Sequence, residues 1–176
     1  MKYQNILSAF AAEPWAIAPE KLEAMTAFLL FKAEGGSFSP DEVAARISNK
    51  RANELAKTEG STAVIPVYGV LAQRMDLMSE ISGGVSYQSL KRSIHEALAN
   101  DDVKAVVLDI DSPGGAVPGT DELASEIRAL RGGDKPIIAQ VNSLAASAAY
   151  WIASAADEIV VTPSGRAGSI GVYTSH

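Results

Sequence analysis

Three apolar runs alternate with two helix patterns in the second half of the chain, and this alternation limits the fold more than any other feature. The runs are short and rich in β-branched residues, as strands are. The predicted strands are 103–111, 136–141 and 158–162, and the predicted helices between them are 123–130 and 146–156. Strands joined by helices form a parallel sheet with right-handed crossovers. The sequence therefore predicts an α/β layer fold, with the nearly unbroken apolar run 103–111 as a buried strand.

The first third of the chain has a different pattern. We predict a helical N-terminal region over residues 1–60 and an α/β domain over residues 61–176. Pro19 fits the first turn of one helix, and Ser39 begins a capping pattern for a second.

The α/β domain begins with a further strand and helix. Residues 62–71 are apolar and β-branched, and Pro66 within them predicts an edge strand or a bulged one, because proline has no N–H to donate. Residues 87–100 have the spacing of an amphipathic helix. At the other end of the chain, residues 168–172 are predicted to lead into another strand.

The composition excludes several classes of function. The chain has 176 residues, of which 47% are hydrophobic and 20% charged, which suits one globular domain with a core. The absence of cysteine excludes a disulfide scaffold, a cysteine nucleophile and a thiolate metal site. No metal-ligand cluster or cofactor motif is visible in the sequence, so we expect neither a metal nor a cofactor.

Charge and hydropathy narrow the choice of partners. A net charge of -6 argues against nucleic acid as the main partner. No apolar run approaches the roughly 20 residues that cross a bilayer. The N-terminus also lacks the apolar run of a signal peptide. We therefore expect a cytoplasmic protein without a membrane partner.

Two loops follow predicted strands, at the edge where open α/β sheets place their sites. The first contains Gly114 and Gly115, which either present backbone N–H groups to a ligand or form a plain turn. The second places Ser147 at or near a helix start, where it is either a helix cap or a nucleophile. About one helix and one strand separate the loops, so a parallel crossover returns the chain to the same edge. We expect the two glycines and Ser147 to face one cleft, as acyl transfer requires.

Three motifs, in this order, resemble the signal peptide peptidase A family of serine peptidases, which shares the ClpP/crotonase superfamily fold. They are Asp-Ser-Pro-Gly-Gly at 111–115, Ala-Ala-Ser-Ala-Ala-Tyr at 145–150 and Gly-Ser-Ile-Gly-Val at 168–172. The Glu-Pro-Trp-Ala-Ile run at 13–17 is similar to the phage head-maturation branch, whose members resemble the minor capsid protein C of lambda-like phages. The resemblance implies a homo-oligomeric serine endopeptidase that cuts scaffold, capsid or portal proteins in the phage prohead, within the host cytoplasm.

The resemblance also implies the roles of individual residues. Ser147 is the nucleophile, and Gly114, Gly115 and Ala148 supply the N–H groups of the oxyanion hole. A deprotonated lysine is the general base, and Ser169 orients it. A lysine acts as a base only where burial lowers its pKa, and the alanines around Ser147 favour such a setting.

No lysine of this chain matches the base of the family. The last lysine is Lys135, before Ser147, whereas the family places its base after the third motif. We therefore expect the base beyond His176, and we expect the 176 residues to be inactive without it. The two histidines, His95 and His176, are disfavoured as substitutes because a base must be oriented as well as present.

Other functions stay open at this point. One is a signal-peptide-peptidase-like or ClpP-like protein-degrading protease, the latter with a Ser-His-Asp triad, although the Gly-Ser-Ile-Gly run favours the lysine branch. Another is an inactive assembly protein with the same fold. A third is a crotonase-type acyl-CoA enzyme, which has no need of a nucleophilic Ser147. Asp109 and Asp111 are expected to cap or brace the glycine loop rather than to act as acids or bases.

Overall fold

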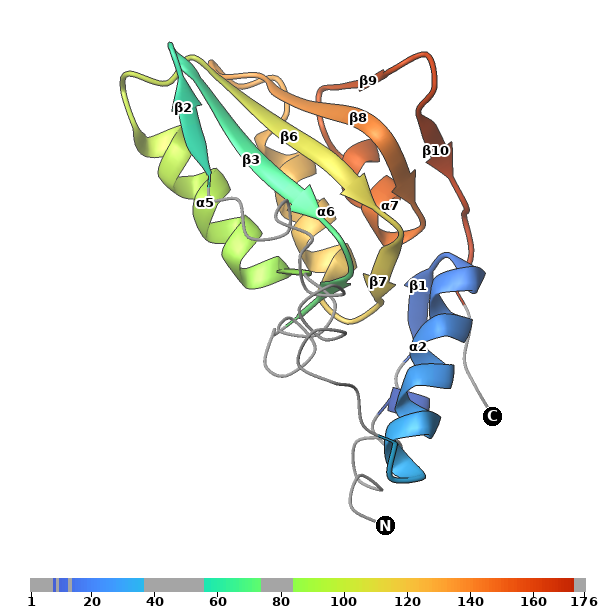
Figure 1. Ribbon diagram of the computed structural model, residues 1–176. Coiled ribbons are helices and arrows are strands. Elements are labelled where there is room, and N and C mark those ends of the chain that lie inside the picture. Colours follow the sequence, from blue (N-terminus) through green and yellow to red (C-terminus); the bar gives the residue numbers. More distant parts are fainter. Residues whose placement is uncertain (1–7, 9, 13, 37–55, 74–83, 173–176) are drawn as a thin grey trace.

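The computed structural model describes residues 8, 10–12, 14–36, 56–73 and 84–172, and these form two sheets with helices beside them (Figure 1). The larger sheet has the strand order β10-β8-β6-β3-β2, and β9 also pairs with β8. Its strands are β2 (Lys57–Glu59), β3 (Thr62–Tyr68), β6 (Ala105–Ser112), β8 (Ile137–Ala146), β9 (Glu158–Val161) and β10 (Arg166–Gly168). Strands β3, β6, β8, β9 and β10 pair in parallel, which confirms the predicted α/β class.

Helices link these strands as the crossover prediction requires. They are α5 (Tyr87–Ala99) between β3 and β6, α6 (Thr120–Leu130) between β6 and β8, and α7 (Ala148–Ser154) between β8 and β9. All three predicted helices of this region are confirmed, although α7 begins two residues later than predicted. Ser86 caps α5, since its hydroxyl accepts a hydrogen bond from the N–H of Ser89.

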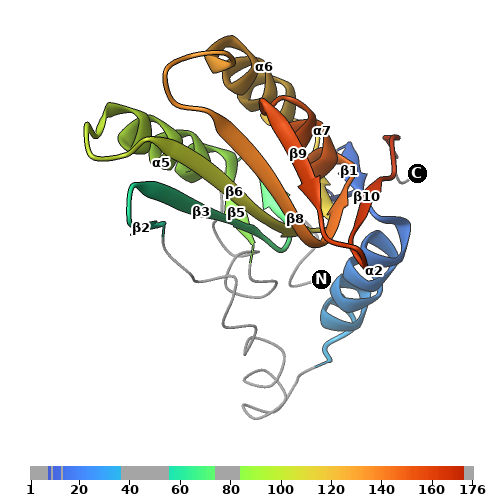
Figure 2. The same cartoon turned by 90° about the horizontal axis from the view of Figure 1, so that it is seen from above.

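The helices α5, α6 and α7 lie on one face of the larger sheet (Figure 1 and Figure 2). Along β6, residues therefore alternate between buried and half-buried, and Val106, Leu108 and Ile110 point into the core under the helices. The apolar run of β6 predicts a buried strand, but only one of its faces is fully buried. Within the described residues, the other face carries half-buried side chains such as Asp109 and Asp111.

Pro66 has the edge-like position that its missing N–H predicts. Strand β6 pairs with the whole of β3, whereas β2 pairs antiparallel with only its first three residues, Thr62 to Val64. On the β2 side, the described part of the chain leaves Pro66 without a neighbouring strand. The proline therefore removes no bond from a two-sided ladder.

The smaller sheet has the strand order β1-β7-β4-β5. Its strands are β1 (Trp15–Ile17), β4 (Leu71–Ala72), β5 (Val85–Ser86) and β7 (Gly114–Ala116). Strand β1 leads into helix α2 (Pro19–Ala33), which begins at the predicted proline. Strands β1 and β2 add two strands to an N-terminal region that was expected to be helical. The second helix predicted there, at Ser39, lies outside the described residues, and the domain boundary at residue 60 stays a prediction.

Two predicted boundaries at one edge of the sheets are wrong. The glycine turn is strand β7, because β1 and β4 pair with it on its two sides. Strand β8 continues to Ala146 instead of ending at Val141, because β6 and β10 both pair with its last residues. The strand into which residues 168–172 are predicted to lead falls outside the described residues.

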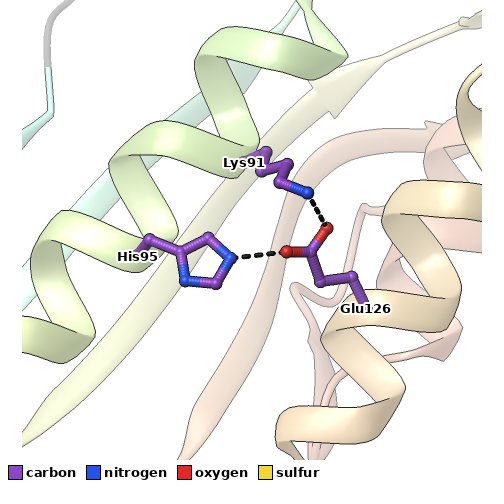
Figure 3. A network of polar contacts seen from close by, with 3 residues as sticks. All are labelled: Lys91, His95 and Glu126. Atoms are coloured by element: carbon purple, nitrogen blue, oxygen red, sulfur yellow. Dashed lines mark hydrogen bonds and ion pairs between the residues drawn. The ribbon is translucent and has the colours of Figure 1, made fainter.

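Helices α5 and α6 are joined by an ion network on the surface (Figure 3). Glu126 of α6 lies 2.8 Å from Lys91 Nζ and 2.5 Å from His95 Nε2, both on α5. The hydrogen bonds from Lys91 and His95 lower the pKa of the Glu126 carboxyl from its usual value. Glu126 thus binds both the Lys91 ammonium group and the His95 ring at the surface of α5.

Asp157 holds the start of β8 beside the turn that precedes β9. Its carboxylate accepts hydrogen bonds from the backbone N–H groups of Ile137 and Gly132, each at 2.8 Å. These two bonds, first that of Ile137 and then that of Gly132, lower the pKa of Asp157 from its usual value. The carboxylate thereby connects the end of the α6 crossover to the strand that follows it.

Replacing this carboxylate tests its contribution to stability. We expect Asp157→Asn to lower the free energy of unfolding by about 1 kcal/mol at pH 7, because an amide oxygen is a weaker acceptor than a carboxylate for two N–H groups. A lowered pKa in the folded state gives stability that is present above the unfolded pKa and lost as pH falls through the folded one, so the difference should shrink below about pH 4. Urea denaturation at pH 7 and pH 3 measures this. The exposed Asp134→Asn is the control, and equal effects of the two variants contradict the assignment.

Candidate active site

Ser147 lies in a tight turn between β8 and α7 and has an unusual backbone conformation. Its φ of 54° and ψ of -114° are in a region that residues other than glycine rarely adopt. Although Ser147 is the N-cap residue of α7, its side chain makes no capping hydrogen bond. Of the two roles that the sequence leaves open, the simple helix cap is therefore wrong.

The surroundings of Ser147 hold this turn in place. Its N–H donates to the carbonyl of Gly168 at 2.8 Å, and its Oγ donates to the carbonyl of Gly171 at 3.0 Å. On the helix side, Ala148 and Ala149 are fully buried, which brings α7 close to the sheet. The side chain of Ser147 is itself only 6% exposed. The hydroxyl is thus enclosed between the start of α7 and the segment that follows β10.

Glycine is the only residue type that fits positions 114 and 115 of β7. A Cβ on Gly115 would lie 1.8 Å from the carbonyl oxygen of Leu71 in β4. Gly114 has a φ of 101°, and a Cβ there would lie 2.3 Å from the carbonyl oxygen of Ala16 and 2.9 Å from that of Ala146. Both positions therefore require a glycine for close backbone approach.

The glycine strand and the serine turn meet at one edge, as predicted. Ser112, just before the glycines, pairs with Ala145, two residues before Ser147. A Cβ on Gly114 would lie 2.9 Å from the Ala146 carbonyl oxygen, so the strand runs close beside the turn. The two loops predicted from the sequence to share one edge therefore lie side by side.

The backbone N–H groups of the two glycines face different neighbours. Ala18 N–H donates to the Pro113 carbonyl at 2.8 Å, and Val117 N–H donates to the Pro14 carbonyl at 3.0 Å. Hydrogen-bonded and non-bonded pairs alternate along an antiparallel ladder. Ala16 and Gly115 lie two residues from each of these bonded pairs, so they also form a bonded pair. The Gly115 N–H therefore points at β1. The Gly114 N–H makes a longer bond, 3.2 Å, to Ser112 Oγ.

The other end of β7 is held by buried side-chain hydroxyls. Tyr87 Oη and Thr120 Oγ1 both donate to the carbonyl of Ala116, at 2.7 and 2.9 Å. The Ser112 hydroxyl, also buried, donates to the Gly69 carbonyl at 2.6 Å. Each end of the glycine strand is thus anchored to α5, to α6 or to the turn after β3.

Among the remaining predicted site residues, Ser169 lies near Ser147, whereas Lys135 and His95 make their contacts elsewhere. Ser169 follows β10, has a φ of 57° and is exposed, one residue from the Gly168 carbonyl that contacts Ser147. Lys135 lies before β8, at the opposite end of that strand from Ser147, and its Nζ donates to the carbonyls of Leu98 and Asn100, each at 2.7 Å. His95 contacts Glu126, and His176 lies outside the described residues.

The carboxylates of Asp109 and Asp111 bond to neighbouring strands of the larger sheet. Asp109 accepts hydrogen bonds from the Tyr68 hydroxyl and the Asn142 amide, and Asp111 accepts one from the Ser143 hydroxyl. These contacts link β3, β6 and β8 across the half-exposed face of the sheet, to which strand alternation turns both side chains. That the two aspartates cap or brace the glycine loop stays a prediction.

Two parts of the site lie in sequence motifs that do not reveal the contacts they make. The carbonyls of Gly168 and Gly171 contact Ser147 through the backbone, which no side-chain pattern reports. Strand β1 borders Gly114 from 97 residues upstream, at Ile17, and its apolar Trp-Ala-Ile run does not report which strand it pairs with.

Two further features were not found among the described residues. None of their helices has the length and apolar character needed to span a bilayer. Their His, Asp and Glu side chains also form no group of three or more that suits a metal ion.

Comparisons with known proteins give a consistent picture. A family model described as the NfeD1b N-terminal domain matches residues 74–176. The head-tail preconnector protein GP5 of Enterobacteria phage P21 is 39% identical over 83% of this chain, and the capsid assembly protease C of Escherichia phage lambda is 37% identical over 65%. Protease 4 of Salmonella typhi is 36% identical over 67%. These matches span 28%, 26% and 18% of the three relatives, respectively, and they confirm the resemblance found in the motifs.

The close contact at Gly114 predicts a severe substitution. We expect Gly114→Ala to lower the free energy of unfolding by about 3 kcal/mol or more, because it combines an unfavourable φ with two backbone clashes. Chemical denaturation followed by circular dichroism measures the loss. The control is Gly133→Ala, where a Cβ would meet only the Leu130 carbonyl, at 3.3 Å. A Gly114→Ala protein as stable as the control contradicts the contact.

Proposed function

The chain belongs to the NfeD1b N-terminal domain family, and because its relatives include named proteases we propose that it carries the nucleophile of a serine endopeptidase. One observation supports this most. Ser147 is held in a strained turn with its hydroxyl released from helix capping, directly beside the glycine strand. A strained nucleophile turn at the carboxyl end of a parallel strand is the arrangement that serine hydrolases use to present an Oγ atom.

The proposed reaction is acyl transfer through Ser147. Its Oγ attacks the carbonyl carbon of a peptide bond while a base removes the hydroxyl proton. The negative charge that develops on the carbonyl oxygen is stabilised by N–H groups, for which we propose Ala148 and the glycine pair Gly114 and Gly115. The tetrahedral intermediate expels the amine after that amine receives the proton. Water then hydrolyses the ester and restores the serine.

The three proposed N–H donors are not equally well placed to stabilise an oxyanion. Ala148 directly follows the nucleophile, and its side chain is fully buried. Gly114 contacts the Ala146 carbonyl, and its N–H has only a long bond to Ser112 Oγ. Gly115 is turned toward β1 by the alternation of the ladder. Among the two glycines, Gly114 is therefore the better supported donor.

We propose a lysine as the base, oriented by Ser169, in keeping with the resemblance to the lysine branch. The polar contacts of Lys91, Lys104 and Lys135 are all with groups remote from the serine turn. Ser169 lies between two residues whose carbonyls contact Ser147, so a group held by Ser169 would approach the hydroxyl. Of the lysines in the described residues, Lys135 is the last in sequence, and it faces the opposite end of β8.

We propose that the substrates are scaffold, capsid or portal proteins of a phage or prophage head, and that the enzyme acts as a homo-oligomer in the host cytoplasm. The names of two relatives, a capsid assembly protease and a head-tail preconnector protein, support this setting. The match to protease 4 supports a second candidate, a processing peptidase of that kind. Cleavage of co-expressed head proteins, compared with cleavage of unrelated unfolded proteins, separates the two.

An activity-based probe tests the nucleophile. We expect a fluorophosphonate to label the full-length protein at Ser147, and we expect Ser147→Ala to reduce labelling by more than about a thousandfold. Ser143→Ala is the matched control, since this serine lies in the same strand but bonds to Asp111 on the open face. Mass spectrometry of the labelled peptide identifies the modified residue. Equal labelling of both variants contradicts the proposal, and no labelling of the wild type supports an inactive assembly protein.

The position of Lys135 predicts a variant that separates stability from activity. Lys135→Met removes the hydrogen bonds to Leu98 and Asn100, so we expect the free energy of unfolding to fall by about 1–2 kcal/mol. The labelling rate should stay that of the wild type because this lysine is not the base. Urea denaturation and probe labelling are measured on the same sample. A loss of labelling without unfolding shows that Lys135 has a role in the reaction.

A further inference from the structure

Strand β1 pairs along the whole length of the glycine strand (Figure 1). Trp15, Ala16 and Ile17 lie opposite Ala116, Gly115 and Gly114, respectively. The pairing continues beyond both ends, where the Ala18 N–H donates to the Pro113 carbonyl and the Val117 N–H donates to the Pro14 carbonyl. A segment from the N-terminal region thus forms one complete side of β7.

Gly114 is enclosed between this segment and the serine turn. The position that a Cβ would occupy lies 2.3 Å from the Ala16 carbonyl oxygen, 3.0 Å from Ile17 Cα and 2.9 Å from the Ala146 carbonyl oxygen. Strand β1 and the residue before Ser147 therefore both approach Gly114 on the side where another residue would carry its side chain. A displacement of β1 changes the distance between Gly114 and the turn.

Strand β1 is itself firmly anchored. Ile17 is fully buried and packs with Leu29 of α2, with Val70 and with Ala116 of β7 in a second apolar cluster. The indole Nε1 of Trp15 donates to the Phe10 carbonyl at 3.1 Å. A strand that only occupied a substrate groove would need to leave it at each turnover, and the burial of all three β1 residues opposes such release.

We propose that β1 and Ala18 are positioning elements that hold Gly114 at its working distance from Ser147. This inference rests on the proposed peptidase function and adds a role for the N-terminal segment, which contributes no reacting group. In serine hydrolases, an N–H donor stabilises the oxyanion only when it is preorganised, so the backing of the glycine strand determines how well the donor works.

Ala18 offers a substitution that changes a single hydrogen bond. Its φ of -58° and ψ of 131° suit a proline, and Ile17 before it is in an extended strand, as a residue before proline must be. The carbonyl of Ala18 still accepts the N–H groups of Lys21 and Leu22. Ala18→Pro therefore removes only the donor to Pro113, the residue that precedes Gly114.

We expect Ala18→Pro in the full-length protein to lower the rate of fluorophosphonate labelling about tenfold, because a misplaced oxyanion donor weakens transition-state stabilisation. For a cleaved peptide, kcat should fall while KM stays unchanged. Hydrogen exchange of residues 113–117 should become faster, which reports the loosened strand independently of activity.

Two controls separate positioning from general stability. Ala18→Ser keeps the N–H and should label at the wild-type rate. Leu29→Ala trims the same buried cluster from helix α2 and leaves β1 unchanged, so it should lower the melting temperature and leave the labelling rate unchanged. If both Leu29→Ala and Ala18→Pro reduce labelling in proportion to their loss of stability, the effect is structural and the proposal fails.

The possible results are distinguishable. Wild-type labelling of a folded Ala18→Pro with faster exchange at 113–117 shows that β1 holds the strand but does not position the site. Faster labelling than the wild type shows that β1 competes with substrate. Either result overturns this inference and leaves the peptidase proposal intact, whereas an unlabelled wild type overturns both.

Discussion

The contact of three backbone segments at Gly114 is the constraint on which the site depends. The carbonyls of Ala16 and Ala146 approach the same side of this residue with no side chain between them. Side chains adjust to a small displacement by changing rotamer, but backbone atoms in direct contact cannot do so. Strand pairing fixes each of the three segments. Ala16 pairs with Gly115 of β7, Ser112 at the end of β6 pairs with Ala145 of β8, and Ala146 pairs with Gly168 of β10.

The strain at Ser147 depends on the same framework. A non-glycine residue at a φ of 54° costs on the order of 1–3 kcal/mol, and such a residue persists only where its surroundings determine the conformation. On one side the ladder to β6 and β10 fixes the end of β8, and on the other the buried alanines of α7 fix the start of the helix. With both ends of the turn set, a single residue must connect them. The strain is thus a consequence of joining a long paired strand to a closely packed helix.

The sequence predicts the elements of the larger sheet well because periodicity reports burial, and burial in this domain follows regular strands and helices. The positions of α5, α6 and the convergence of Gly114 with Ser147 all follow from that pattern. The sequence pattern does not predict features that depend on which backbone segments pair with each other. It gives no sign that β8 extends to Ala146, because the added pairing comes from the short strand β10. Nor does it show that the glycines form a strand, because their partners in β1, Ile17 and Ala16, are 97 and 99 residues away. It also gives no sign of the bonds from Asp109 and Asp111 to the neighbouring strands β3 and β8, which arise because alternation along β6 turns both carboxylates to the half-exposed face.

The hydrogen bond from Ser147 Oγ to the Gly171 carbonyl bears on how the proposed reaction begins. A backbone carbonyl accepts a hydrogen bond but does not take up a proton at neutral pH, so this contact orients the hydroxyl without activating it. A base that removes the proton must lie where the hydrogen points, and in this structure that direction belongs to Gly171. Attack therefore requires either that the hydroxyl turns to another acceptor or that the segment after Ser169 moves aside. Gly168, whose carbonyl holds the Ser147 N–H, lies in strand β10 just before this segment. Rotation of the hydroxyl therefore preserves the strained turn, whereas a displacement that extended back into β10 would loosen it.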